Sequence, residues 1–258
     1  MNIVVIPARF GSTRFPGKPL ARIQGRSMIW HVYHRSLKAK RVDAVWVATD
    51  DVRIYDEVKG WGGRVMMTRP DHASGTDRVA EVAERISCDI VVNVQGDEPM
   101  MDPAVIDAVV EPLTRNPSIG IVTPITKIKK IEEIFDPSIA KVVRDAEGFA
   151  LYFSRSPIPY GRDIEKFTTY KGETPEDEQM EFLEKYPFYR HIGLYAFERK
   201  TLMKFCELPK SDLENVEKLE QLRALEYGIP LLTVLVEYNG ISVDHPEDIL
   251  RIQKGITG

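Results

Sequence analysis

The stretch "NIVVIPARFGSTRFPGKPL" (residues 2–20) joins a short apolar run to a loop rich in glycine, proline and basic side chains. "NIVVI" is typical of a strand buried on both faces, because its apolar residues follow one another without interruption. The loop behind it, residues 7–20, carries Arg9, Arg14 and Lys18. In open α/β sheets, ligands bind outside the carboxyl ends of the strands. This stretch therefore predicts an α/β protein with an anion site behind its first strand.

The rest of the chain alternates short apolar runs with helical patterns, which predicts an α/β fold with a mostly parallel central sheet and helices on both faces. The polar stretch 161–187 is a loop, an irregular excursion or a partner-facing extension. We expect a single domain, 1–258, whose second half is elaborated. The predicted strands are 2–6, 43–49, 64–68, 89–95, 119–125, 150–156, 190–197 and 231–237; the predicted helices are 27–38, 76–86, 103–113, 213–227 and 246–256.

Composition narrows the classes of partner. The net charge is −4, so no global basic field gathers nucleic acid, and any anion site is made locally. Cys88 and Cys206 have neither metal-ligand nor CxxC spacing. No apolar run approaches the roughly 18 residues of a membrane span, and the short N-terminal run does not have the form of a signal peptide. These features predict a cytoplasmic protein without nucleic-acid or membrane partners.

The opening loop departs from the best-known phosphate-binding motifs. Gly11 and Gly17 stand one residue too far apart for a P-loop, and Pro19 replaces the hydroxyl residue that would reach magnesium. The dinucleotide motif GxGxxG is absent from the loop as well. A stiff loop whose backbone donors and cations surround a polyphosphate remains the favoured interpretation. The alternative is a surface loop with scattered salt bridges.

Two aspartates could hold a hard cation. Asp97 follows a buried strand in "VNVQGDEP", where a carboxylate faces the same crevice as the opening loop; the alternative is a turn residue before Pro99. Asp244 in "SVDHPEDI" has Glu247 three residues later, which is the pattern of a capping box. Spacing alone favours a helix cap at Asp244, although one carboxylate oxygen would stay available to a metal.

Other polar residues permit two interpretations each. Ser74, Gly75 and Thr76 begin a helix and suit a phosphate or ribose as well as simple capping. His191 lies in a predicted strand, where a structural role is the more common one. Solvated charge is the default for Glu217, Glu220 and Gln221, which share a helix with a leucine-rich face. Since no Ser–His–Asp or Cys–His constellation stands out, direct nucleotidyl transfer without a covalent intermediate is favoured.

The ordered motifs resemble those of the 3-deoxy-manno-octulosonate (KDO) cytidylyltransferase family, also called CMP-KDO synthetases. The opening loop alone is only moderately specific, whereas the "YFSR", "RHIG" and "EQLR" blocks are much more so. The resemblance implies a Rossmann-like nucleotidyltransferase fold, a homodimer built through a subregion at about 150–200, and CTP, a sugar acid and Mg²⁺ as reactants. The motifs are "IPARFGSTRFPGKPL", "VATDD", "SGTDR", "NVQGDEP", "ALYFSRSPIP", "RHIGLYAF", "EKLEQLRALEYG" and "VDHPEDI".

The resemblance also implies roles for individual residues. Asp97 and Asp244 become the magnesium carboxylates, which overrules the cap at Asp244. Lys18, Arg14, Asp97 and Asp244 form the catalytic set, with Lys18 stabilising the transition state. The implied nucleotide ligands are Arg9, Gly11, Ser12, Arg14, Lys18, Ser74, Gly75 and Arg78. The implied ligands of the sugar acid are Gln95, Arg155, Arg190, His191, Glu220 and Gln221, with Arg155 or Arg190 suited to its carboxylate.

Three departures from the family pattern leave the acceptor open. Phe15 replaces a common leucine, His245 stands where threonine is usual, and the 161–188 segment is long and highly charged. The 8-amino analogue of the octulosonate is therefore an alternative acceptor, and another nonulosonic acid such as sialic acid, or a sugar phosphate, is a second. An alternative of a different class is a nucleotide-sensing module that kept the loop without catalysis.

Overall fold

The computed structural model describes residues 1–258 except 12–14, 163–175, 241, 244, 251 and 253–258. The chain divides into two compact units. The first unit comprises residues 1–120, 193–207 and 238–258, and the second comprises 121–192 and 208–237. Each unit is therefore built from separate stretches of sequence. The single domain expected over 1–258 stays a prediction.

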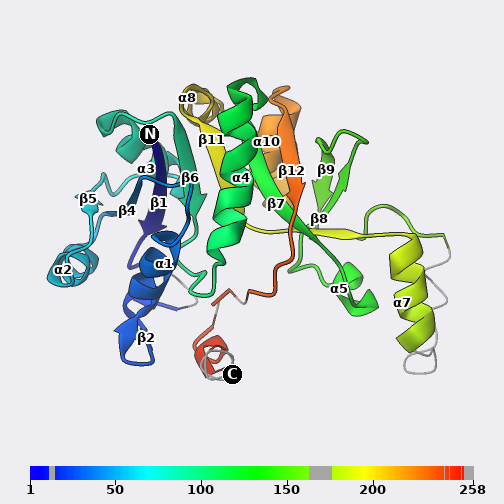
Figure 1. Ribbon diagram of the computed structural model, residues 1–258, viewed down its shortest axis with the longest axis horizontal. Helices are drawn as coiled ribbons and strands as arrows, with labels where there is room; N and C mark the ends of the chain where they lie inside the picture. Colours follow the sequence, from blue (N-terminus) through cyan, green and yellow to red (C-terminus); the bar gives the residue numbers. More distant parts are fainter. Residues whose placement is uncertain (12–14, 163–175, 241, 244, 251, 253–258) are drawn as a thin grey trace. The chain divides into compact units, whose positions relative to one another are not determined.

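The strands of the first unit follow the order β5-β4-β1-β6-β11. β1 pairs in parallel with β4 on one side and with β6 on the other, so the chain moves outward from β1 in both directions (Figure 1). Every residue of β6 is buried, as expected for a strand covered on both faces. The strands are β1 (Asn2–Ala8), β4 (Ala44–Thr49), β5 (Val65–Met67), β6 (Ile90–Val94) and the antiparallel β11 (Leu194–Glu198).

Helices of the first unit fall into two groups. One group is α1 with α4, which contact each other, and the other is α3 with α8. The helices of both groups also contact strands of the sheet. This arrangement is expected when helices cover both faces of a sheet. Near the opening loop lie the short helix η1 (Lys18–Leu20) and the hairpin of β2 (Arg22–Ile23) and β3 (Arg26–Ser27). The helices are α1 (Met28–Ser36), α2 (Val52–Gly60), α3 (Gly75–Arg85), α4 (Pro103–Arg115), η2 (Pro117–Ile119) and α8 (Arg199–Glu207).

In the second unit β12 pairs with β7, and the strand order continues β7-β10-β8-β9. β12 and β7 are parallel, whereas β10, β8 and β9 are antiparallel to their neighbours. The elements are β7 (Ile121–Lys127), α5 (Ile131–Phe135), β8 (Lys141–Arg144), β9 (Ala150–Ser154), α7 (Glu176–Lys185), β10 (Tyr189–His191), α9 (Asp212–Glu217), α10 (Gln221–Glu226) and β12 (Leu231–Leu235).

The predicted α/β class is confirmed, but two predicted elements are each divided in two, and the polar stretch contains a helix. The strand expected at 190–197 is two strands, β10 and β11, because the chain passes from the second unit to the first at Gly193. The helix expected at 213–227 is broken at Lys218, which adopts a left-handed conformation with φ 56° between α9 and α10. Within the polar stretch 161–187, helix α7 was not predicted; its Leu183 packs with four other buried apolar residues, among them Phe188.

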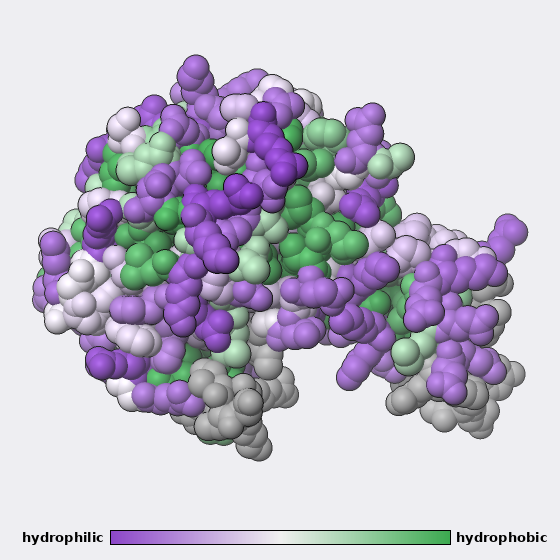
Figure 2. Space-filling model, in the orientation of Figure 1, coloured by the Kyte–Doolittle hydropathy of each residue, from purple (hydrophilic) through white to green (hydrophobic). Residues whose placement is uncertain are grey.

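The surface of the described residues is mixed in polarity. Figure 2 shows polar side chains over most of the face drawn, with smaller apolar areas between them. None of the helices in the described ranges combines the length and the apolar character needed to cross a membrane. The closing helix expected at 246–256 is helical at 248–250 and 252, and the remaining positions from 253 onward lie outside the described residues.

Candidate functional site

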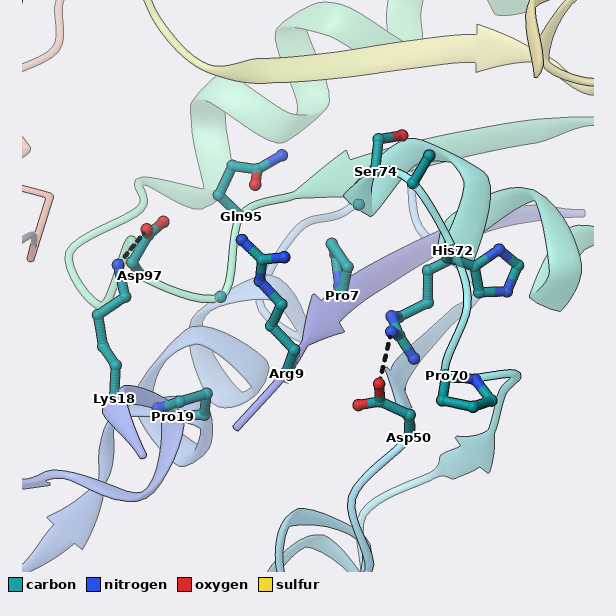
Figure 3. Close-up of a pocket in the computed structure, with 15 residues that line it drawn as sticks. Pro7, Arg9, Lys18, Pro19, Asp50, Pro70, His72, Ser74, Gln95 and Asp97 are labelled. Carbon is teal, nitrogen blue, oxygen red and sulfur yellow. Dashed lines mark hydrogen bonds and ion pairs between the residues drawn. The ribbon is translucent and has the colours of Figure 1, made fainter. Parts of the chain in front are cut away.

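A cavity of about 330 Å³ lies in the first unit, at the carboxyl ends of β1, β4 and β6 (Figure 3). This is where the sequence predicted an anion site, since the strands diverge on either side of β1. Among the sequence-predicted ligands it collects Arg9, Lys18, Ser74, Gly75, Arg78, Gln95 and Asp97. Its other lining residues are Pro7, Ala8, Pro19, Asp50, Pro70, His72, Ala73 and Gly96.

Lys18 and Asp97 form an ion pair on one side of the cavity (Figure 3). The Lys18 ammonium donates to Asp97 Oδ2 at 2.6 Å and to the Val243 carbonyl at 2.9 Å. The backbone N–H of Val243 donates in turn to the Asp97 carbonyl at 2.9 Å. The segment before Asp244 is thus attached to both residues of the pair, and two groups more than 70 residues apart in sequence share one small volume.

The opening loop is closed at its base by backbone and ring contacts. The N–H of Gly17 donates to the Phe10 carbonyl at 2.9 Å, and a Cβ at Gly17 would lie 3.0 Å from the Phe10 ring. The Arg53 guanidinium stacks over the same ring at 3.3 Å from its centroid, while also pairing with Asp51. Gly17 has φ 73°, a conformation that favours glycine. These contacts place Arg9 and Lys18 at the two ends of the loop.

Ser74 is a helix cap and a cavity residue at once. Its hydroxyl accepts from the N–H of Asp77 at 3.2 Å, and the Asp77 carboxylate accepts from the N–H of Ser74 at 2.9 Å, which is a complete capping box. The cap that the sequence allowed is therefore present, and Ser74 also lines the cavity. At Gly75 a Cβ would lie 3.3 Å from Pro7, so the N-terminus of α3 lies close to the end of β1.

Arg78 lies in a buried ion pair that the sequence analysis did not foresee. Its NH2 donates to Asp50 Oδ2 at 3.0 Å, and its NH1 donates to Thr68 Oγ1 and the Arg69 carbonyl. The Arg78 side chain is 5% exposed. Asp50 directly follows β4, so the rule that singled out Asp97, an acid behind a buried strand, would have found it. Arg78 thus lines the cavity while its guanidinium is bonded to protein groups.

Gln95 is positioned from behind the cavity. Its side-chain amide donates to Asn93 Oδ1 at 3.2 Å, and the Asn93 amide donates to Thr76 Oγ1 at 3.2 Å. Asn93 is completely buried in β6. This chain of hydrogen bonds links the end of β6 to the first turn of α3 and orients Gln95 in the cavity wall (Figure 3).

Arg155 belongs to the second unit, and most of its donors are engaged. Its Nε donates to the Glu217 carbonyl at 2.9 Å, and its NH1 donates to the Pro137 carbonyl at 2.9 Å. The Glu217 carboxylate accepts from the Ser154 hydroxyl at 2.6 Å and from the N–H of Arg155 at 3.0 Å. The default of solvated charge was therefore wrong for Glu217, because the end of α9 packs against the end of β9.

His191 is fixed by a polar and an aromatic contact in the second unit. Its Nε2 lies 2.8 Å from the Thr123 hydroxyl, and its ring meets Phe153 edge-on at 5.2 Å. Burial lowers the pKa of His191 to about 3, so the ring is neutral near neutral pH. Arg190, its neighbour in β10, pairs with Lys141 of β8 and Thr126 of β7 along the sheet.

Glu220 and Gln221 begin helix α10 in the second unit. Arg223, two residues further on, forms a buried bidentate pair with Glu214, with both N–O distances at 2.7 Å. Its NH2 also lies 3.6 Å from Glu220 Oε1. Gln221 is 5% exposed, so the default of solvated charge was wrong there too; Glu220 is half-buried.

Some predicted site residues are not placed in the cavity. Gly11 is exposed and is not among its lining residues. Ser12, Arg14 and Asp244 lie outside the described residues, as does the proposed cap at Asp244. Within the described ranges, no cluster of three or more His, Cys, Asp or Glu side chains has the arrangement of a metal site.

Comparisons with known proteins agree in pointing to one enzyme family. The family model described as Cytidylyltransferase matches residues 3–237. The 3-deoxy-manno-octulosonate cytidylyltransferases of Syntrophotalea carbinolica and Geobacter sulfurreducens are each 49% identical to the chain, with 98% of either chain covered. A solved CMP:2-keto-3-deoxy-manno-octonic acid synthetase complexed with CTP is 40% identical, with a TM-score of 0.88 over 100% of this chain and 99% of that one.

A more distant solved structure shares the fold alone. The 4-diphosphocytidyl-2C-methyl-D-erythritol synthase of Anaerococcus prevotii is 14% identical, with a TM-score of 0.61 over 100% of this chain and 99% of that one.

Proposed function

The chain belongs to the 3-deoxy-manno-octulosonate cytidylyltransferases, and from this premise we propose how its own residues carry out the transfer. The enzyme activates the octulosonate with CTP, giving the CMP-sugar and pyrophosphate. One bond forms between the anomeric hydroxyl oxygen of the sugar acid and the α-phosphorus of CTP. The bond from that phosphorus to the bridging oxygen breaks, pyrophosphate leaves, and the hydroxyl proton passes to solvent.

The observation that carries the proposal is the Lys18–Asp97 pair in the cavity at the strand ends. It brings a cation suited to phosphate and a carboxylate suited to a hard metal into hydrogen-bond distance. We propose that Arg9, Arg14 and Lys18 bind the triphosphate, and that Lys18 stabilises the charge that develops on the α-phosphate. A preorganised donor of this kind acts without reorganisation at the moment of reaction.

The nucleoside contacts are proposed on the opposite side of the cavity. Ser74 and Gly75 present the N-terminus of α3, whose backbone donors suit phosphate or ribose oxygens. Arg78 is proposed to act through its bonds to Asp50 and the Arg69 carbonyl, which hold the adjoining wall. Gly11 and Ser12 are proposed as further backbone donors of the loop.

For the sugar acid, the proposed ligands keep the assignment that the family resemblance implies. Glu217 supports this set by bonding to the backbone and hydroxyl groups at the end of β9. Several donors of Arg155 bind carbonyl groups, and Arg155 and Arg190 are both proposed as partners of the substrate carboxylate. The set is Gln95, Arg155, Arg190, His191, Glu220 and Gln221.

Magnesium is proposed as the metal, held by Asp97 and Asp244. The donor chemistry fits, since magnesium is usually bound by one or two carboxylates together with substrate phosphates. Asp97 lines the cavity while paired with Lys18, and Val243, which binds both Asp97 and Lys18, directly precedes Asp244 in the chain. When bound, the metal would neutralise phosphate charge and lower the pKa of the attacking hydroxyl.

The acceptor is tested by measuring pyrophosphate release with CTP and Mg²⁺. Parallel reactions contain 3-deoxy-manno-octulosonate, its 8-amino analogue, sialic acid or no acceptor. We expect the highest kcat/KM with octulosonate and no sustained release without a sugar. Higher kcat/KM with the amino analogue or sialic acid would reverse that order. Tight CTP binding without release for any sugar would favour the nucleotide-sensing module. The Lys18→Ala variant, assayed in parallel, controls for contaminating phosphatases.

A homodimer built through the second unit is proposed from its exposed apolar side chains. Nine of the exposed large hydrophobic residues in the described ranges lie in that unit and five in the first, although the second unit is the smaller. Where such side chains adjoin one another, they mark interaction sites. Light scattering at micromolar protein is expected to give twice the chain mass, and a monomer mass would reject the dimer. The nine are Phe135, Leu151, Tyr160, Met180, Tyr186, Leu213, Val216, Tyr227 and Leu235.

The cellular setting is proposed from the reaction. The activated octulosonate is proposed to serve lipopolysaccharide biosynthesis, with the transfer taking place in the cytoplasm. Cell fractionation followed by the release assay tests this location. Activity that sediments with the membrane fraction would contradict it.

A further inference from the structure

One wall of the cavity is held by a helix face that lies behind it. After β5 the chain runs through residues 68–74, and Pro70, His72, Ala73 and Ser74 of this segment line the cavity. The segment has no regular secondary structure of its own. On α3, the side chains of Arg78, Glu81 and Arg85 share one face, because they are three and seven residues apart. Arg78 and Glu81 bind residues of this segment, and Arg85 binds the carbonyl of Met67, the residue just before it.

Glu81 makes two hydrogen bonds to this wall. Its Oε2 lies 2.5 Å from His72 Nε2 and accepts from the N–H of Arg69 at 3.0 Å. Its Oε1 accepts from Arg85, whose other amino group donates to the Met67 carbonyl. The side chains of Glu81 and His72 are 6% and 4% exposed. A buried carboxylate with this many donors is strongly fixed in place.

The charge of Glu81 is retained despite its burial. Burial by itself raises the pKa of this carboxyl, but the hydrogen bonds from His72 and the Arg69 backbone, together with the charge of Arg85, more than offset it. The net pKa is lowered from its ordinary value, so Glu81 is an anion at neutral pH. A carboxylate accepts stronger hydrogen bonds from these donors than a neutral side chain would.

The His72 ring is an anchor, with its polar edge bonded behind the cavity wall. Figure 3 shows the ring turned away from Arg9 and Pro7, on the side of α3. His72 and its neighbours line the cavity, while the His72 side chain is bonded to Glu81 of α3. Since α3 is itself packed on β1, β4 and α8, it provides a fixed support for this bond.

We propose that Glu81 is a positioning residue for nucleotide binding: through His72 and the Arg69 amide it holds segment 69–74 at the distance from β1 that CTP requires. The inference rests on the proposed function of the cavity. Glu81 touches neither the Lys18–Asp97 pair nor the proposed ligands of the sugar acid among the described contacts. Its effect is therefore specific to the nucleotide.

The test compares Glu81→Gln with Glu84→Gln, an exposed glutamate on the same helix for which the described residues show no hydrogen bond or ion pair. Calorimetry measures the Kd for CTP–Mg²⁺ without acceptor, and steady-state assays measure KM for each substrate. For Glu81→Gln we expect a Kd about tenfold weaker, the effect of losing one charged hydrogen bond, with the KM for octulosonate changed less than about twofold. Glu84→Gln should match the wild type.

A second variant separates positioning from folding. His72→Leu removes the donor to Glu81 Oε2 and leaves Glu81 bonded to Arg69 and Arg85, so its charge stays compensated. His72→Leu should weaken CTP binding as Glu81→Gln does. The double variant should bind CTP no more weakly than the single variant with the higher Kd, since both substitutions act on the same bond.

An unchanged Kd for CTP in folded His72→Leu would overturn the proposal, whatever its melting temperature, and so would equal increases in both KM values. A wild type that does not bind CTP would instead reject the proposed function of the cavity.

Discussion

Acidification is expected to weaken the second unit through His191. The His191 ring contacts Phe153, and its Nε2 is bonded to the Thr123 hydroxyl, so the folded protein stabilises the neutral ring. Burial lowers its pKa from 6.5 to about 3. Below pH 6.5 the unfolded chain binds a proton that the folded chain does not. His191 therefore stabilises the fold fully above pH 6.5, and this contribution is lost progressively as the pH falls toward 3.

The size of the effect follows from proton linkage. With these pKa values, complete desolvation would lower the free energy of unfolding by about 2 kcal/mol on going from pH 8 to pH 5. The residue as a whole is only partly buried, so solvent reaches some of its surface. We therefore expect about 1–2 kcal/mol from His191 between these two pH values.

Urea unfolding at several pH values between about 8 and 5 measures this contribution. The comparison is between wild type and His191→Gln, which cannot titrate in this range. His245→Gln, at an exposed position, controls for the loss of a histidine. Because His31 and the carboxylates titrate in all three proteins, the difference in slope isolates His191.

The variant should lose about 1–2 kcal/mol less than the wild type over this range. Parallel curves for wild type and His191→Gln would refute the reasoning, whatever the offset between them.

Three substitutions test the site itself. Lys18→Ala should lower kcat about 100-fold or more in the pyrophosphate assay, as for other preorganised donors, and an unchanged kcat would exclude the assigned role. Gly17→Ala adds strain of about 1–2 kcal/mol at positive φ and brings a methyl to 3.0 Å from the Phe10 ring, so the KM for CTP should increase. Gly25→Ala, also at positive φ but with no neighbour within 4 Å, is its control; equal effects would contradict the contribution of the ring contact. Glu217→Gln should increase the KM for the sugar acid and leave that for CTP unchanged, and a parallel increase in both would disprove a specific role.

The sequence predicted the parallel strands and the position of the cavity for a simple physical reason. Uninterrupted apolar runs predict buried strands, and the carboxyl ends of neighbouring parallel strands meet at one edge. Residues directly behind such strands, Arg9 and Asp97, therefore had to lie near each other. Lys18 followed because the loop leaves from the same edge. For these residues, chain position alone implies proximity.

Local pattern was insufficient where a side chain's partner lies far away in sequence. The leucines at 213–225 predicted one continuous helix, yet the chain turns at Lys218, next to the point where Glu217 is bonded to the end of β9. Helical periodicity describes which face is apolar; it carries no information about a tertiary contact strong enough to end the helix.

By itself, the sequence determined the α/β class, the buried strands, the cation-rich loop and the acid behind β6. Only the tertiary structure decided what each charged group binds: Arg78 with Asp50, Glu81 with His72, Glu217 with the end of β9. The physical reason is that burial and secondary structure follow from short-range periodicity, which the chain displays locally. The energy of a buried charge depends on which partner group the fold brings within about 3 Å of it. Strand register and helix packing across the whole unit decide which group that is.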